Sequence, residues 1–158
     1  MGTKKRILFV CLGNTCRSPI AEAVFMDLVK KAGYQRDWEI DSAAIESWHV
    51  GNRPNPRAVA IMERYYLGYD NRARQITTED FYTFDYILGM DDYNIEDLHE
   101  LRPKDATAHI FLLGDFDPQG ERIIRDPYCD NNSDGFDKCY HQAMRSCKSF
   151  LEEIYAVD

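Results

Sequence analysis

Long hydrophobic runs are missing from this sequence. No apolar stretch approaches the length needed to cross a membrane, and no secretory-type segment precedes Arg6. A surplus of positive charge is missing as well, because 27 Asp and Glu outnumber 19 Lys and Arg and give a formal net charge of −8. Proteins that bind nucleic acid carry basic stripes, so we expect no nucleic-acid partner. These absences predict a cytoplasmic protein without stable membrane insertion.

A disulfide framework is missing too. Five cysteines are an odd number, and their spacing matches neither a disulfide scaffold nor a zinc module. A metal site built from Cys129, Cys139, His141 and Cys147 would have the wrong ligand spacing. We therefore expect reduced thiols in a reducing compartment and no bound metal.

The composition fits one globular domain. The chain has 158 residues, of which 44% are hydrophobic, and this is enough to bury a sizeable core. It contains no internal repeat, low-complexity tract or clear linker. We expect a single domain over residues 1–158, present as a monomer or a weak homodimer.

Short apolar runs alternate with amphipathic stretches along the chain. The apolar runs predict four strands, at residues 7–10, 38–43, 85–90 and 109–113. Apolar residues at helical spacing predict helices at 18–33, 56–67, 92–98 and 136–154, and a short helix after Thr77 or Thr78. Strands that alternate with helices favour an α/β fold, with a four-stranded parallel, doubly wound sheet and helices on both faces.

The most informative segment joins the first predicted strand to the first predicted helix, and reads Cys11-Leu12-Gly13-Asn14-Thr15-Cys16-Arg17-Ser18. Five residues separate Cys11 from Arg17, which is enough for a loop whose backbone N–H groups converge on one anion. A guanidinium at the rim of such a loop pairs with two phosphate oxygens. Ser18 suits an N-cap and Pro19 the first helical position, so the positive end of a helix faces the same anion. The segment predicts a phosphate-binding loop with a sulfur nucleophile.

These residues resemble the phosphate loop of the low-molecular-weight protein tyrosine phosphatase family. Blocks similar to that family's motifs occur in the family's order, at residues 10–14, 18–22, 41–44, 73–77, 84–88 and 126–128. The resemblance implies a single three-layer domain of flavodoxin-like topology. It also implies hydrolysis of phosphotyrosine in proteins, with small aryl phosphates as further substrates.

The resemblance assigns the chemistry to three residues. Cys11 is the nucleophile that forms a phosphocysteine, and Arg17 binds the phosphoryl oxygens. The sequence alone does not single out Asp126, because Asp-Pro is a common turn dipeptide, but the family places its general acid at this Asp-Pro-Tyr block. Asp126 then protonates the leaving oxygen and later activates water, while Ser18 donates a hydrogen bond to the sulfur. This chemistry needs no metal or organic cofactor.

Further positions are expected to shape the loop and the pocket. The phosphate-binding loop comprises Leu12, Gly13, Asn14, Thr15, Cys16 and Ser18 besides the nucleophile and the arginine. In the family, Asn14 and Ser42 are the polar pair that pins this loop, and Asn71 stands where a histidine often supports the same network. Trp48 and Tyr128 are expected to flank the aryl ring of the substrate. Cys129 replaces a second tyrosine of many members, so regulation by phosphorylation at that position is not expected here.

Two questions stay open at the level of sequence. The resemblance implies that Cys16 traps an oxidised Cys11 as a reversible disulfide, but Cys16 could also simply pack beneath the loop. Two alternative functions also remain. A thioredoxin-coupled arsenate reductase shares the loop and fold but needs further cysteines near residues 82–91, where this chain has none. A catalytically silent phosphotyrosine-binding module is the other alternative, although Cys11, Arg17 and Asp126 are all present.

Overall fold

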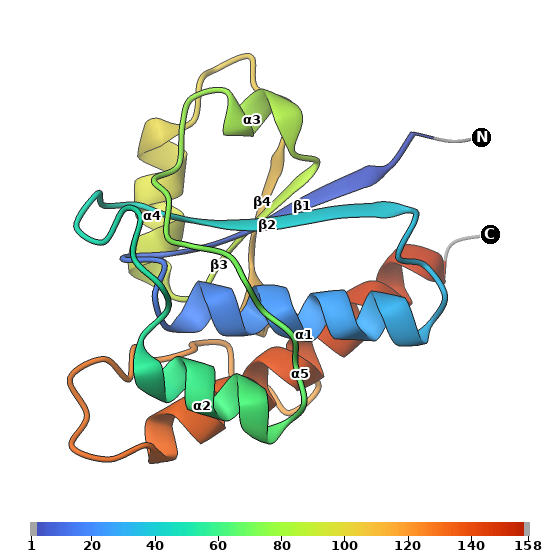
Figure 1. The fold of residues 1–158 in the computed structure, drawn as a ribbon. Helices are drawn as coiled ribbons and strands as arrows, with labels where there is room; N and C mark the ends of the chain where they lie inside the picture. Colours follow the sequence, from blue (N-terminus) through green and yellow to red (C-terminus); the bar gives the residue numbers. More distant parts are fainter. Residues whose placement is uncertain (1–2, 157–158) are drawn as a thin grey trace.

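The strands form one parallel sheet. A computed structural model describes residues 3–156, so the outermost two residues at each end of the predicted 1–158 domain lie outside the described part. The strands are β1 (Lys5–Cys11), β2 (Trp38–Ala44), β3 (Tyr86–Gly89) and β4 (His109–Leu112). Their order in the sheet is β2-β1-β3-β4, and every neighbouring pair is parallel (Figure 1). The predicted four-stranded parallel sheet is confirmed.

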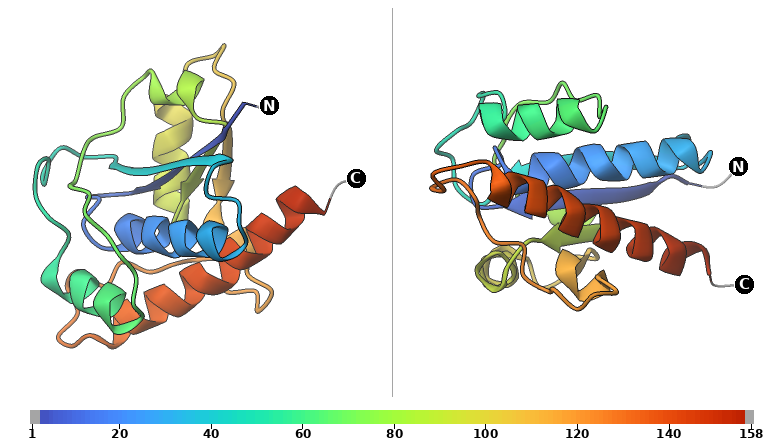
Figure 2. Two further views of the ribbon diagram at one scale, coloured as in Figure 1. Left: turned by 45° about the vertical axis from the view of Figure 1, so that its right-hand side comes forward. Right: turned by 90° about the horizontal axis from the view of Figure 1, so that it is seen from below.

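Helices cover both faces of this sheet. They are α1 (Arg17–Lys31), α2 (Pro56–Arg64), α3 (Asp80–Thr83), α4 (Asp92–Leu101) and α5 (Asp134–Tyr155), with a 3-10 turn η1 (Leu113–Phe116). The long helices α1 and α5 lie side by side on one face, with α2 beside them, and α4 lies on the other (Figures 1 and 2). Among residues 3–156, no helix combines the length and the apolar character that a membrane span requires.

The central strand explains why the run at residues 7–10 is apolar throughout. Ile7 and Phe9 belong to the core under α1 and α5, where the Phe9 ring lies 5.6 Å from that of Phe25. Leu8 and Val10 point to the opposite face and pack in a second core with residues of α3 and α4. Successive side chains of a strand alternate between faces, so a strand buried on both sides needs an apolar residue at every position.

The topology brings distant loops to one edge of the sheet. The chain runs from β1 to β2 on one side and to β3 on the other, so the carboxyl ends of β1 and β3 meet at the point where the strand order reverses. Cys11 ends β1, and Asp91 follows β3 at the same edge. This edge is where open α/β sheets bind their ligands.

Some helix boundaries differ from the predictions. α1 begins at Arg17 with Cys16 at the N-cap, and the Ser18 hydroxyl caps nothing because it contacts Asn14 and the Cys11 sulfur. α2 ends at Arg64, before the predicted residue 67, because Tyr66 takes a left-handed conformation with φ of 61°. The predicted cap at Asp91 is present, since its carboxylate accepts a hydrogen bond from the Asn94 backbone at 2.8 Å.

Candidate active site

The sulfur of Cys11 lies where β1 ends and α1 begins. Cys11 is only 3% exposed. Its Sγ lies 3.0 Å from the Ser18 hydroxyl and accepts a hydrogen bond from the Ser18 backbone N–H at 3.4 Å. That N–H belongs to the first turn of α1, so the positive end of the helix points at the sulfur. We call residues 11–17 the phosphate loop.

Asn14 ties the phosphate loop to three other segments. It has a φ of 57°, a left-handed conformation that asparagine tolerates better than most residues. Its amide donates to the hydroxyls of Ser18 at 2.8 Å and Ser42 at 2.9 Å, and its carbonyl oxygen accepts from the Arg74 backbone at 3.1 Å. The structure therefore brings Asn14 and Ser42 into direct contact.

Asn71 reaches this network only through Glu22, a residue that the sequence reasoning missed. Glu22 is fully buried on α1 and accepts hydrogen bonds from Ser42 at 2.5 Å, Tyr69 at 2.7 Å and Asn71 at 2.5 Å. Burial raises the pKa of the Glu22 carboxyl to about 7, and the three donors oppose part of that rise. A charged residue on the apolar face of a predicted helix was the available signal.

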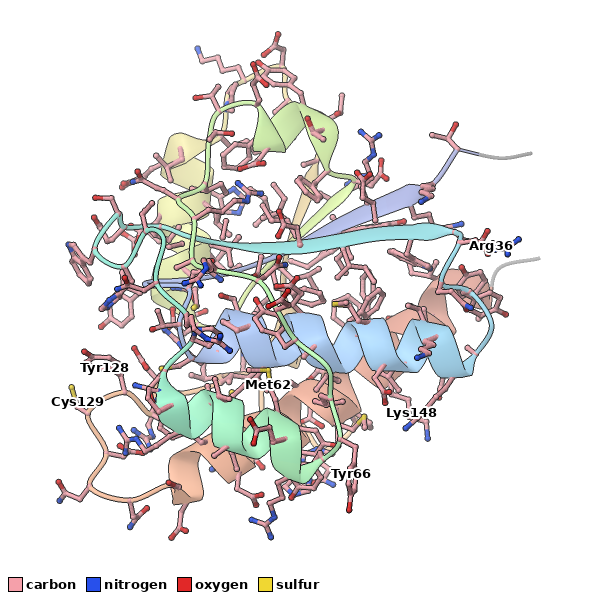
Figure 3. All side chains as sticks on the ribbon, viewed as in Figure 1. Arg36, Met62, Tyr66, Tyr128, Cys129 and Lys148 are labelled. Carbon is pink, nitrogen blue, oxygen red and sulfur yellow. The ribbon has the colours of Figure 1, made fainter. Side chains whose placement is uncertain are left out.

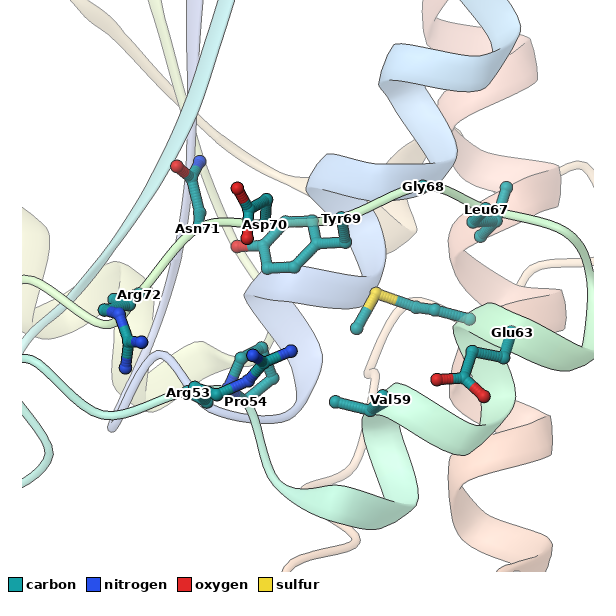
Figure 4. Close-up of a pocket in the computed structure, with 11 residues that line it drawn as sticks. Arg53, Pro54, Val59, Glu63, Leu67, Gly68, Tyr69, Asp70, Asn71 and Arg72 are labelled. Atoms are coloured by element: carbon teal, nitrogen blue, oxygen red, sulfur yellow. The ribbon is translucent and has the colours of Figure 1, made fainter.

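A cavity adjoins this network, because Tyr69 and Asn71 line it. It has a volume of about 260 Å³, and Tyr69 and Asn71 both line it on the segment that crosses above α1 (Figure 4). It contains neither Cys11 nor Arg17. It therefore adjoins the groups that hold the phosphate loop rather than the nucleophile.

Arg17 is fixed by a carboxylate that was predicted only as a helix cap. The Arg17 side chain is 3% exposed, and its Nη1 donates to Asp91 Oδ2 at 2.6 Å and to the Ile124 carbonyl at 3.0 Å. Its Nη2 faces Asp126 Oδ2 at 3.7 Å. Asp91 thus caps α4 with one oxygen and holds Arg17 with the other. Its position directly after β3, at the edge where Cys11 ends β1, was the signal in the sequence.

Asp126 lies at the mouth of the site on an irregular segment. Its side chain is 41% exposed, and Oδ1 accepts a hydrogen bond from the Tyr128 backbone at 3.0 Å. Between this carboxylate and the sulfur lies a cavity of about 420 Å³. Its lining comprises Cys11, Leu12, Gly13, Thr15, Cys16, Arg17, Trp48, His49, Asp126, Tyr128 and Cys129. The three residues expected to carry the chemistry therefore meet in one cavity.

The aromatic lining of this cavity includes one ring that was not predicted, that of His49. Trp48 and Tyr128 both line the cavity and are 65% and 47% exposed. The ring beside Tyr128 is that of His49, with centroids 6.0 Å apart. Sequence reasoning missed His49, whose only signal was its place next to Trp48. Figure 3 shows Tyr128 and Cys129 at the outer edge of the molecule, and both line this cavity.

All five cysteines are free thiols. Cys16, within the phosphate loop, is 4% exposed, and burial raises the pKa of its thiol to about 12. Cys16 therefore stays protonated at neutral pH and does not compete with Cys11 as a nucleophile. No group of three or more metal-ligating side chains is found among residues 3–156.

Comparisons with known proteins agree with this geometry. The model of the family "Low molecular weight phosphotyrosine protein phosphatase" matches residues 6–157. The pig (Sus scrofa) protein of that name is 51% identical over 152 residues, which cover 95% of this chain and 96% of that protein.

Solved structures show the same fold. The crystal structure of Primo-1 is 45% identical with a TM-score of 0.91, over 94% of this chain and 97% of that one. The crystal structure of DARP, described as a Drosophila arginine phosphatase, is 39% identical with a TM-score of 0.91, over 96% and 99%. With the family match spanning nearly every residue, the chain belongs to the low molecular weight phosphotyrosine protein phosphatases, a family of hydrolases.

Proposed function

We propose that this protein hydrolyses phosphotyrosine in proteins, and small aryl phosphates, through a phosphocysteine on Cys11. The observation that carries the proposal is the position of the Cys11 sulfur. It lies in the cavity that Arg17 and Asp126 also line, and it faces the first turn of α1. A buried sulfur at a helix N-terminus beside a guanidinium is suited to react as the thiolate.

In the first step, the Cys11 thiolate attacks phosphorus and the bond from phosphorus to the phenolic oxygen breaks. Asp126, in its protonated form, gives its proton to that oxygen, and a neutral phenol leaves. Arg17 and the loop N–H groups bind the three equatorial oxygens, where negative charge accumulates. Because Asp91 holds Nη1 of Arg17, the guanidinium is oriented before substrate arrives.

In the second step, water attacks the phosphocysteine. The Asp126 carboxylate accepts a proton from the water, the sulfur–phosphorus bond breaks, and inorganic phosphate and the Cys11 thiolate result. The Ser18 hydroxyl, 3.0 Å from the sulfur, donates a hydrogen bond to the departing thiolate. Asp126 ends the cycle protonated, ready for the next substrate.

The pocket shape favours an aryl phosphate. The phosphate must reach a sulfur at the bottom of the cavity, while Trp48 and Tyr128 line it further out. An aromatic pair contributes about 0.5–1.5 kcal/mol beyond the area it buries. The free thiols are consistent with a reducing compartment such as the cytoplasm, and a monomer or weak homodimer suffices for this chemistry.

Phosphoarginine in proteins is a second candidate substrate, favoured by Thr15. Thr15 lines the cavity, and its hydroxyl has a sulfur, that of Cys16 at 3.9 Å, as its partner. A guanidine N–H could donate to this hydroxyl and to the Asp126 carboxylate, whereas a phenol ring offers no such donor. The similar structure described as an arginine phosphatase supports the same candidate.

The variant Thr15→Val separates the two substrates, because valine keeps the shape and removes the hydroxyl. A site that hydrogen-bonds its substrate discriminates strongly once that bond is lost. We expect kcat/KM for a phosphoarginine peptide to fall about tenfold, with phosphotyrosine peptide turnover retained. An equal loss on both substrates would reject phosphoarginine recognition by Thr15.

The central test is phosphate release from a phosphotyrosine peptide by wild-type protein and by Cys11→Ser. Release by the wild type, abolished in the variant, supports the proposed mechanism. Retained peptide binding without release under reducing conditions would instead favour the silent binding module. An arsenate reductase is disfavoured because residues 82–91 contain no cysteine.

A further inference from the structure

Asp126 is carried by a segment with no helix or strand of its own. We call residues 126–133 the acid loop. They form the last part of the connection between η1 and α5. The Asp126 carboxylate accepts a hydrogen bond from the Tyr128 backbone at 3.0 Å and faces Arg17 at 3.7 Å. Arg125, next to Asp126 in the chain, donates to the Asp126 carbonyl at 3.1 Å and to the Asp130 carboxylate at 2.9 and 2.6 Å, so it braces the loop locally without tying it to a helix or strand. A general acid must lie within hydrogen-bond reach of the leaving oxygen, so the position of this loop has to be set from elsewhere.

One side chain of α2 donates hydrogen bonds to three carbonyl oxygens of the acid loop. The guanidinium of Arg57 donates to the carbonyl oxygens of Asp130 at 2.7 Å, Asn132 at 3.1 Å and Tyr128 at 2.8 Å. It also lies over the ring of Phe136, 4.6 Å from the centroid. A planar fork with several fixed donors can hold three carbonyl oxygens at once, which an ammonium cannot do in the same geometry.

The helix that carries Arg57 is itself attached to the phosphate loop. Asn55, the N-cap of α2, accepts a hydrogen bond from the Arg57 backbone at 2.9 Å. The Asn55 backbone N–H donates to the Thr15 carbonyl at 2.8 Å. Arg57 therefore stands between two parts of the site that are far apart in sequence. One is the loop that holds the phosphate, and the other is the loop that holds the acid.

We propose that Arg57 is a positioning residue that fixes the acid loop relative to the phosphate loop, so that Asp126 lies at the leaving oxygen. This rests on the proposed function, in which Asp126 is the general acid. Arg57 itself does not line the cavity and does not touch the reacting atoms. Its effect on the reaction is therefore indirect, through the geometry of Asp126.

The inference predicts a loss that depends on the leaving group. Protonation matters more when the departing oxygen is more basic, so Arg57→Ala should lower kcat/KM about tenfold for phenyl phosphate and about twofold for 4-nitrophenyl phosphate. In an Asp126→Ala background, Arg57→Ala should cost less than about twofold on either substrate, because the group it positions is gone. Arg57→Lys should restore part of the loss, since it keeps the charge and loses the fork.

Arg64→Ala is the matched control. Arg64 lies on the same helix, but its side chain is 67% exposed, lies 3.7 Å from Asp137 and stacks over the Tyr65 ring at 5.6 Å, and neither of these residues belongs to the acid loop. It should retain wild-type kcat/KM on both substrates. As a readout that does not depend on turnover, amide hydrogen exchange at Tyr128 and Asp130 should accelerate in Arg57→Ala and not in Arg64→Ala.

The outcomes separate this inference from the function on which it rests. An active wild type in which Arg57→Ala loses the same factor on both aryl phosphates would overturn the positioning role alone. So would unchanged hydrogen exchange in the acid loop, or full additivity with Asp126→Ala. An inactive wild-type protein would overturn the proposed function and the positioning role together.

Discussion

Asp91→Asn tests the structural reasoning about Arg17 most directly. Asp91 uses both carboxylate oxygens, because Oδ1 caps α4 at the Asn94 backbone and Oδ2 accepts from Arg17 at 2.6 Å. Asparagine has one acceptor oxygen and remains a good N-cap. The substitution therefore keeps the cap and removes the closer of the two carboxylates that face the Arg17 guanidinium.

The expected cost follows from burial. The Arg17 side chain is 3% exposed and that of Asp91 is 17% exposed, so water cannot replace the lost partner fully. A charge-assisted hydrogen bond contributes about 1.5–3 kcal/mol, and breaking a buried ion pair costs about 3–5 kcal/mol. Because Ile124 and Asp126 still face the guanidinium, we expect the free energy of unfolding to fall by about 2–4 kcal/mol.

The assay is urea unfolding followed by the fluorescence of Trp38, which is 3% exposed in the core. The control is Asp92→Asn, one residue further along. Asp92 pairs with Arg122 at 2.9 Å, but both side chains are more than half exposed, so the loss should stay below about 1 kcal/mol. A difference of less than about 1 kcal/mol between the two variants would refute the argument from burial.

Three further predictions concern the surroundings of the site. Burial raises the pKa of Glu22 from 4.5 to about 7, so the native state binds more protons in that window and stability falls as pH rises through it. From pH 5 to 7, this effect should lower the free energy of unfolding of the wild type by about 1–3 kcal/mol, and Glu22→Gln should remove this pH dependence in urea unfolding. The same pH dependence in the variant would contradict the role of Glu22. Gly135→Ala should displace the acid loop, because a Cβ there clashes with Asp130. It should lower kcat/KM about tenfold, whereas Gly68→Ala, with open space around it, should not. With inorganic phosphate present to protect the nucleophile, a maleimide should modify exposed Cys129 and inhibit turnover while buried Cys139 stays unmodified by mass spectrometry. Inhibition that persists in Cys129→Ser would reject that site.

The elements of the fold could be predicted because their signals are local. The apolar run at residues 7–10 and the helical spacing after Pro19 depend only on neighbours in the chain, and both predict elements that the structure contains. Helix ends were less predictable. Ser18 has the chemistry of an N-cap, but the competing contacts with Asn14 and Cys11 take its hydroxyl. Those contacts depend on the backbone conformation of the phosphate loop, which the spacing of residues along the chain does not reveal.

By itself, the sequence determined the parallel α/β sheet and the placement of Cys11 and Arg17 at the two ends of one short loop. It could do so because both follow from short-range patterns in the chain. Only the tertiary structure decided that Asp91 holds Arg17, that Glu22 joins Ser42 to Asn71, and that Arg57 grips the acid loop. These partners lie up to 75 residues apart along the chain. The order of strands in the sheet brings such groups together, and burial then makes each contact strong because water is excluded.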